Sequence, residues 1–146
     1  METLDSILFY NIDKAIKVYR QFAQTRIEAS GIDITIDQWM VLKALFENPE
    51  ATQSDIAAIV FKDNASVSRI IELLIKKKML KRKIHKIDRR RSSLAITQYA
   101  IDVMDELQVL IQANRAIALE TIDSTQVSVM NEKLKLIIKN CQAQLK

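Results

Sequence analysis

Glycine and proline are almost absent from this chain of 146 residues, which contains one of each, Gly31 and Pro49. Strand ends and tight turns commonly use these two residues, so their scarcity disfavours a β-rich fold. Hydrophobic residues make up 49% of the chain, which is enough to build the core of one domain. We therefore expect a single, mainly α-helical domain over residues 1–146. The scarcity of glycine also excludes the Gly-rich loops that cradle phosphates in many nucleotide-binding enzymes.

Helix-capping residues divide the chain into six expected helices. Two of the N-cap candidates, Thr35 and Asp123, are followed three residues later by Gln, which is the spacing of a capping box. Thr52, Asp63 and Thr97 are further N-cap candidates. Together with apolar residues at helical spacing, these caps predict helices at 4–29, 36–48, 53–60, 64–78, 98–122 and 124–146. Alternating segments at 80–87 and 94–97 predict a β-hairpin, so the order of elements is that of a winged helix-turn-helix.

The charges of the chain are concentrated in one segment, although the net charge of +4 is modest. Residues 62–91 contain twelve Lys and Arg against three Asp and Glu, and the rest of the chain contains ten against fifteen. The segment is thus strongly basic on an acidic body. A solvated charge run and a surface that binds a polyanion such as nucleic acid both explain this pattern.

The predicted helix at 64–78 has one apolar side and one polar side at 100° per residue. Its apolar side is expected to face the core and its polar side to face outward, beginning with small residues that allow a close approach to a DNA groove. Serine and asparagine can bind base edges or phosphates, arginine can bind guanine, and a helix N-terminus attracts phosphate. An ordinary N-cap cluster on a surface helix is the alternative. The candidate DNA-binding residues here, with two from the preceding helix, are Gln53, Ser54, Asn64, Ala65, Ser66, Ser68 and Arg69.

The predicted hairpin carries a basic tip. Arginines at the end of a protruding ribbon suit the minor groove, where narrow tracts concentrate negative potential. Asp88 is expected to pair with a neighbouring arginine and to shape the turn. The candidate DNA-binding residues of this wing are Lys86, Arg89, Arg90 and Arg91.

The run from Asp88 to Thr97 resembles the wing signature of the MarR family, the multiple-antibiotic-resistance regulators. Asp88 and Arg90 match the family's Asp-x-Arg pair at the tip of the wing. Ile96 and Thr97 match the pair that closes its second strand.

Two further segments carry the same resemblance: residues 64–69 are similar to the start of the family's recognition helix, and residues 38–42 to its second helix. Two positions depart from the family, because Ala100 and Met79 stand where it usually has glycine. The resemblance implies a winged helix at about 35–97 and a homodimer formed by the terminal helices at about 1–30 and 98–146. It also implies binding of palindromic operators and, often, control by a small ligand or by oxidation.

Other functional residues are sparse. Cys141, which follows apolar residues at helical spacing, is expected in a packed core or interface rather than in a redox sensor. His85 is the only histidine and is expected on the wing surface, so no metal site or nucleophile–base pair can be nominated and no cofactor is expected. The aromatic residues could line an effector pocket but are more typical of a core: Tyr10, Tyr19, Phe22, Trp39 and Phe46.

The sequence thus predicts a homodimeric winged helix-turn-helix protein that binds double-stranded DNA and represses transcription until a small-molecule effector releases it. A single cysteine, no signal-peptide pattern at residues 1–13 and no long apolar stretch indicate a cytoplasmic protein without a membrane span. Because no nucleophile–base pair can be nominated, we expect no enzymatic activity. Two alternatives remain open, a helical protein-interaction module with a basic hairpin and an RNA-binding winged helix.

Overall fold

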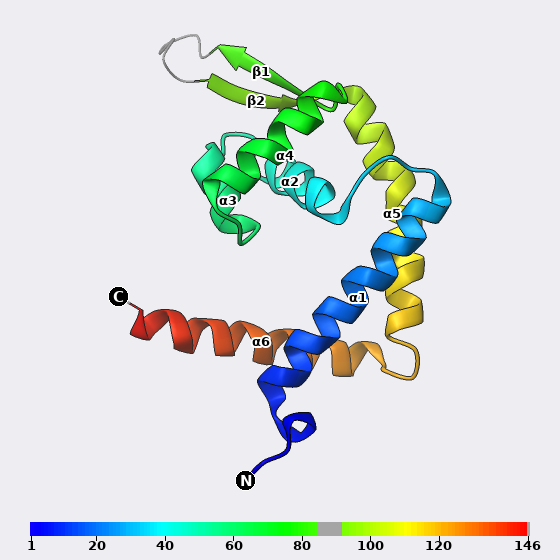
Figure 1. Ribbon diagram of the computed structural model, residues 1–146, viewed down its shortest axis with the longest axis vertical. Coiled ribbons are helices and arrows are strands. Elements are labelled where there is room, and N and C mark those ends of the chain that lie inside the picture. Colours follow the sequence, from blue (N-terminus) through cyan, green and yellow to red (C-terminus); the bar gives the residue numbers. More distant parts are fainter. Residues whose placement is uncertain (85–91, 146) are drawn as a thin grey trace. The chain divides into compact units, whose positions relative to one another are not determined.

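The structure, a computed structural model, describes residues 1–84 and 92–145. It confirms the predicted fold class, a mainly α winged helix-turn-helix with a two-stranded hairpin (Figure 1). The described chain forms two compact units, Met1–Ile111 and Gln112–Lys146. The elements are η1 (Leu4–Ser6), α1 (Leu8–Ser30), α2 (Ile36–Glu47), α3 (Gln53–Ile59), α4 (Asn64–Lys76), β1 (Leu80–Ile84), β2 (Ser92–Ile96), α5 (Gln98–Ala118) and α6 (Ser124–Gln144).

Helix α1 begins four residues later than the sequence predicts. Leu4–Ser6 form a short 3₁₀ turn, and Ile7 is extended, with φ −88° and ψ 119°, so the α-helix starts at Leu8. Its end follows the prediction, because Gly31 adopts the left-handed conformation, with φ 80°, and its N–H donates to the carbonyl of Glu28. Glycine adopts this conformation without a steric cost.

The predicted N-caps are present, and three of them form complete capping boxes. The Thr35 hydroxyl accepts from the Gln38 N–H at 3.0 Å, and the Gln38 side chain accepts from the Thr35 N–H at 3.2 Å. Thr52 forms the same box with Asp55, which the sequence analysis treated as a simple cap. Asp123 forms the third box at the start of α6. Each box satisfies two backbone N–H groups that the helix leaves open.

The hydrophobic core lies in the first unit, among α2, α3, α4, the hairpin, the end of α1 and the first part of α5. Each of these helices contributes its apolar side, and the largest side chains of the core are completely enclosed. Fully buried examples are Leu42, Leu45, Ile56, Ile71, Leu74, Leu80 and Leu107. This core fixes the positions of α3 and α4, which form the helix-turn-helix.

The hairpin is antiparallel, with Leu80 opposite Ile96 and Ile84 opposite Ser92. The strands differ from their predicted limits, since β2 begins at Ser92 and ends before Thr97. Thr97 caps α5 instead: its hydroxyl accepts from the Ala100 N–H at 3.2 Å and donates to the carbonyl of Lys78 at 2.7 Å. The base of the wing is thereby joined to the end of α4.

The tip of the wing lies outside the described residues. This segment includes His85 and all the wing residues that the sequence nominated. The predictions for Lys86, Asp88, Arg89, Arg90 and Arg91 therefore stay predictions.

The second unit consists of the end of α5 and of α6. Helix α5 ends at Ala118, before the predicted limit near residue 122, and Thr121 in the following turn has φ 68°. None of the residues of α6, all of which the structure describes, is buried. Its exposed large apolar side chains are Val129, Met130, Leu134, Leu136 and Ile138.

Two expectations about packing are wrong within the single chain. Phe46 is 52% exposed and Tyr10 is 36% exposed, so these two aromatic side chains are not part of the core. Cys141 is exposed, so it is not a core thiol, and its predicted place in an interface stays a prediction. Both errors have one cause: helical spacing identifies an apolar face, but it does not say whether that face packs within the chain.

Candidate nucleic-acid interface

The turn between α3 and α4 has the geometry of a Schellman motif. The Lys62 N–H donates to the carbonyl of Ala57 at 3.0 Å, and the Phe61 N–H donates to the carbonyl of Ala58 at 3.4 Å. Phe61 occupies the left-handed position, with φ 59°, and its side chain is 86% exposed. Glycine is usual at this position, so the turn is built with a backbone strain that sequence reasoning did not anticipate.

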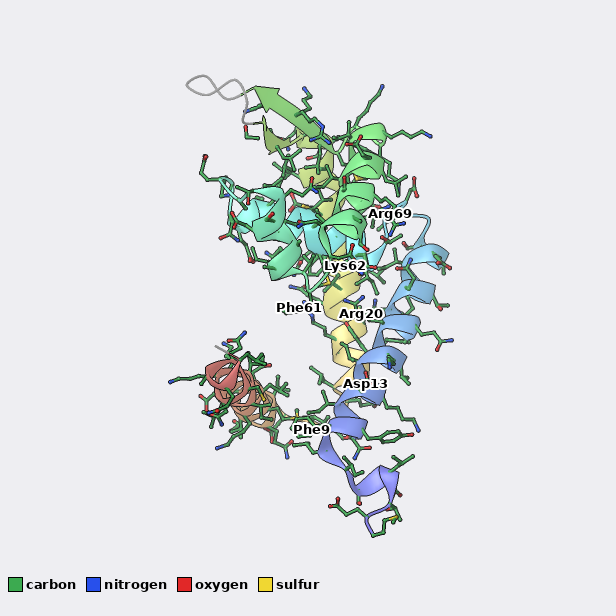
Figure 2. All side chains as sticks on the ribbon, turned by 60° about the vertical axis from the view of Figure 1, so that its left-hand side comes forward. Phe9, Asp13, Arg20, Phe61, Lys62 and Arg69 are labelled. Atoms are coloured by element: carbon green, nitrogen blue, oxygen red, sulfur yellow. The ribbon has the colours of Figure 1, made fainter. Side chains whose placement is uncertain are left out.

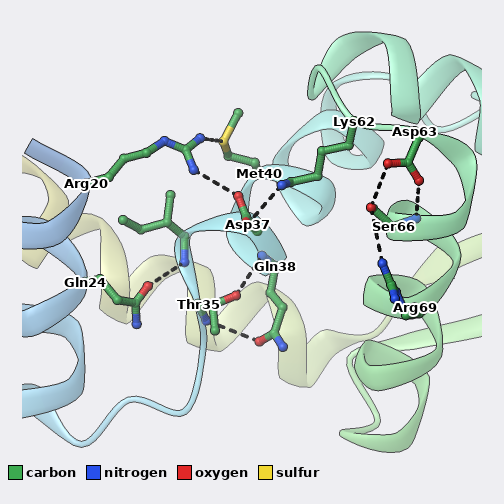
Figure 3. Close-up of polar contacts among 11 residues, drawn as sticks. Arg20, Gln24, Thr35, Asp37, Gln38, Met40, Lys62, Asp63, Ser66 and Arg69 are labelled. Carbon is green, nitrogen blue, oxygen red and sulfur yellow. Dashed lines mark hydrogen bonds and ion pairs between the residues drawn. The ribbon is translucent and has the colours of Figure 1, made fainter. Parts of the chain in front are cut away.

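Asp63 starts α4 at the end of this turn, as predicted. Its carboxylate accepts from the Ser66 N–H at 2.7 Å and from the Ser66 hydroxyl at 2.9 Å (Figure 3). These two hydrogen bonds hold the pKa of Asp63 below its ordinary value, and the bond from the Ser66 backbone N–H has the larger effect. The Ser66 hydroxyl also lies 3.5 Å from Arg69 Nη2. The first turns of α4 therefore present an ordered set of polar groups on the surface.

The apolar side of α4 faces the core and its polar side faces outward, as the sequence predicts. Val67, Ile71 and Leu74 are completely buried, and Ile70 is half-buried. The candidate residues at the start of α4 share the other side: Asn64, Ala65 and Arg69 are exposed, and Ser66 and Ser68 are half-buried.

The two candidates on α3 lie close to this surface in the helix-turn-helix. Gln53 Nε2 donates to the carbonyl of Asn64 at 3.4 Å, so its side chain supports the start of α4. Ser54 is exposed on the same turn of α3. The structure thus brings the seven predicted residues of α3 and α4 together. Whether they contact DNA stays a prediction.

Two residues that the sequence analysis did not nominate belong to the same surface. Glu72 is exposed on the outward side of α4 and forms an ion pair with Arg82 of β1. Ser68, Arg69, Glu72 and Leu73 line a shallow hollow on this side. Helical periodicity placed Glu72 outward, but only the folded hairpin shows that Arg82 reaches it.

An ion-pair network connects α1, α2 and the turn of the helix-turn-helix (Figure 3), and its two cations, Arg20 and Lys62, are labelled in Figure 2. Asp37 contacts Arg20 Nη1 at 3.0 Å and Lys62 Nζ at 3.3 Å. Arg20 also donates to the sulfur of Met40 at 3.1 Å. Burial raises the pKa of Asp37, but the hydrogen bonds from Arg20 and Lys62 outweigh it, and the net shift is downward.

Some cations of the basic segment form contacts within the protein instead of facing a polyanion. Lys62 pairs with Asp37, as described above. Lys77 donates to Asp33 Oδ1 at 3.1 Å and to Gln38 Oε1 at 3.0 Å. The remaining lysines of the described segment are exposed on α4 and the hairpin: Lys76, Lys78, Lys81 and Lys83. A positive surface remains beside the outward face of α4.

The described residues offer little for other chemistry. They contain no group of three or more His, Cys, Asp and Glu that could hold a metal ion. No helix in this part of the chain is long and apolar enough to cross a membrane.

The fold and this surface define a winged helix-turn-helix protein, and comparisons with known proteins agree. Residues 34–92 match the MarR family. The chain is similar to BpsR of Bordetella bronchiseptica, with 18% identity and a TM-score of 0.83 over 94% of this chain and 96% of that one. It is also similar to MepR of S. aureus in a DNA complex, with 20% identity and a TM-score of 0.78 over 92% and 98% of the two chains. A Listeria innocua protein of unknown function is 26% identical, with a TM-score of 0.68 over 91% of each chain.

These matches confirm the resemblance to the MarR family that the sequence predicts. The family match covers the winged helix, from just before α2 to the start of β2. The solved structures agree with the whole order of elements. One departure from the family can now be explained: the left-handed residue after α4 is Lys78, with φ 63°, whereas Met79 is buried beneath the turn. Ala100 is buried in the first turn of α5, where alanine is well tolerated.

Proposed function

We propose that this chain is a DNA-binding transcriptional regulator that places α4 in the major groove and the wing against the adjacent backbone or minor groove. The observation that carries the proposal is the outward face of α4, which has small polar residues in its first turn, after the Asp63 cap, and Arg69 one turn further on. Such a face suits both phosphates and base edges. The match to the MarR family over this segment supports the same reading.

The proposed active form is a homodimer on a palindromic operator. The terminal helices expose apolar side chains that the winged helix does not need, such as Leu8 and Phe9 on α1 and Leu134 and Ile138 on α6. A two-fold interface would bury the same patch of both subunits and would present two copies of α4 to two half-sites.

The proposed mode of control is repression that a small ligand relieves. BpsR, which shares this fold, has its DNA binding regulated by 6-hydroxynicotinic acid, and MepR was solved on DNA. That ligand belongs to BpsR, and the ligand of this chain is to be found by experiment. We propose no enzymatic activity for the chain.

Selection of bound sites from random duplex DNA tests the proposal. We expect one palindromic sequence to be enriched, and its duplex to bind more tightly than a scrambled duplex or an RNA of the same sequence. A preference for RNA would favour an RNA-binding winged helix, and no binding to either would favour a protein-interaction module.

Variants then test which helix reads the sequence. Arg69→Ala should cost about 1–3 kcal/mol for each lost base contact on the selected site, and less on the scrambled duplex. Because a dimer uses two copies of α4, the measured loss can approach twice that amount. Lys139→Ala, which removes the same charge from α6, is the matched control and should change neither affinity. Equal losses on both duplexes for Arg69→Ala would show that α4 does not read bases.

A further inference from the structure

Glu72 stands out on the face of α4 because it is the only acidic residue of that helix. It lies one turn beyond Ser68 and Arg69, and its side chain is 59% exposed. A carboxylate here would face a polyanion, and its charge would oppose binding unless another group compensates it.

Arg82 of β1 provides this compensation. Its guanidinium forms an ion pair with the Glu72 carboxylate, and its side chain is itself 45% exposed. The pair joins the base of the wing to the middle of α4, and it restricts where the carboxylate can lie. It also leaves Glu72 at the hollow that it shares with Ser68, Arg69 and Leu73.

The chemistry of this hollow suits one base better than the others. A carboxylate can only accept hydrogen bonds, so in the major groove it needs an exocyclic amino group. Cytosine and adenine both offer one, but the N6 amino group of adenine lies beside the N7 acceptor, which repels a carboxylate, and Glu is a recognised partner for the N4 amino group of cytosine. Leu73, which is 48% exposed beside Glu72, provides an apolar surface for the neighbouring C5 edge of a pyrimidine.

We propose that Glu72 is a specificity-determining residue that accepts a hydrogen bond from the N4 amino group of a cytosine in each half-site. Arg82 is its positioning residue: it keeps the carboxylate on the reading face and cancels its charge against the phosphates. This inference rests on the proposed function, because it requires α4 to lie in the major groove.

The test measures the affinity of the full-length protein for the selected duplex and for every single base-pair change in one half-site. The wild type should lose about tenfold in affinity at one C·G pair when the cytosine is replaced. Replacing that cytosine with a pyrimidin-2-one nucleoside, which lacks only the N4 amino group, should give the same loss.

Variants separate the two roles. Glu72→Ala should remove the preference at this pair while leaving the preferences elsewhere in the half-site unchanged. Arg82→Ala should weaken the preference at the same pair and also lower affinity for all duplexes. Lys81→Ala, an equal loss of charge on the same strand, is the matched control and should lower affinity without changing any preference.

Each possible failure has its own signature. If Glu72→Ala keeps every base preference, or if the pyrimidin-2-one duplex binds as well as the cytosine duplex, the role of Glu72 is wrong. If Arg82→Ala behaves as Lys81→Ala does, Arg82 is only a phosphate ligand. If the wild-type protein prefers no duplex, the proposed function itself fails. Glu72 and Arg82 are exposed, so these truncations spare the core, and circular dichroism and sedimentation of each variant verify fold and assembly.

Discussion

Replacing Lys78 with glycine is expected to stabilise the protein. Lys78 is the left-handed residue that ends α4, with φ 63°. The Met79 N–H donates to the carbonyl of Leu74 at 2.9 Å, and the Lys78 N–H donates to the carbonyl of Ile75 at 2.9 Å. These two bonds define a Schellman motif, in which position 78 is the place where glycine is preferred. The side chain of Lys78 is exposed, so its removal costs little packing.

The expected gain is small but measurable. A left-handed conformation costs an L-residue roughly 1–2 kcal/mol, and glycine removes this cost. Glycine also makes the unfolded chain more flexible, which costs about 0.5–1 kcal/mol. The net stabilisation is therefore about 0.5–1 kcal/mol. For a chain of this size a change of 1 kcal/mol shifts Tm by about 2–4 °C, so we expect a rise of up to a few degrees.

Thermal and urea unfolding at one fixed protein concentration would measure this gain, since the stability of a dimer depends on concentration. Lys78→Ala is the first control, because it removes the same side chain but keeps the Cβ atom, and it should give no gain. Lys76→Gly is the second control. It places glycine at the last residue of α4, where there is no left-handed strain to relieve, and should give no gain in stability. A Lys78→Gly protein no more stable than Lys78→Ala would refute the reasoning.

Four further results are expected. Because the folded pKa of Asp37 lies below its unfolded value of 3.8, its network stabilises the fold fully above that pH and loses this contribution as the pH falls through the folded pKa. Acid titration of Asp37→Asn should lack this loss; an unchanged acid profile would contradict it. Sedimentation at micromolar concentration should give a dimer, and a monomeric mass would exclude the proposed assembly. The log–log salt dependence of DNA affinity should have a slope of about −5 to −7, from roughly three or four phosphate contacts per subunit, and a slope shallower than about −2 would contradict it. Arg90→Ala should weaken binding to all duplexes, and full retention of binding after loss of all three tip arginines would remove the wing from the interface.

The sequence predicts the helix-turn-helix well because its signals are local. The caps at Thr35, Thr52 and Asp63 determine where α2, α3 and α4 begin, and the apolar spacing of α4 determines its buried side. These signals act within a few residues, so they can be read without knowing the rest of the fold. The same reasoning gathers the seven candidate residues of α3 and α4 on one surface.

Features that depend on distant residues could not be predicted in this way. The pairing of Glu72 with Arg82 requires the hairpin to fold back along α4, and the pairing of Asp37 with Arg20 and Lys62 requires three elements to meet. The exposure of Phe46 depends on which surfaces stay uncovered in the folded chain, which periodicity does not reveal.

Although glycine is scarce, the chain forms left-handed turns with other residues. Four described residues are left-handed, yet only Gly31 among them is glycine, and two of the others, Phe61 and Lys78, border α4. What holds each of these two turns is the residue that follows it. Lys62 is bound by Asp37 at 3.3 Å, and Met79 is 1% exposed in the core. An ion pair thus holds the turn that precedes the Asp63 cap of α4, and a buried side chain holds the turn that follows α4. Both contacts offset the backbone strain at these turns. It follows that Phe61→Gly and Lys78→Gly should leave the orientation of α4 unchanged, whereas Met79→Ala should both destabilise the fold, by about 2–5 kcal/mol, and loosen the junction between α4 and the wing.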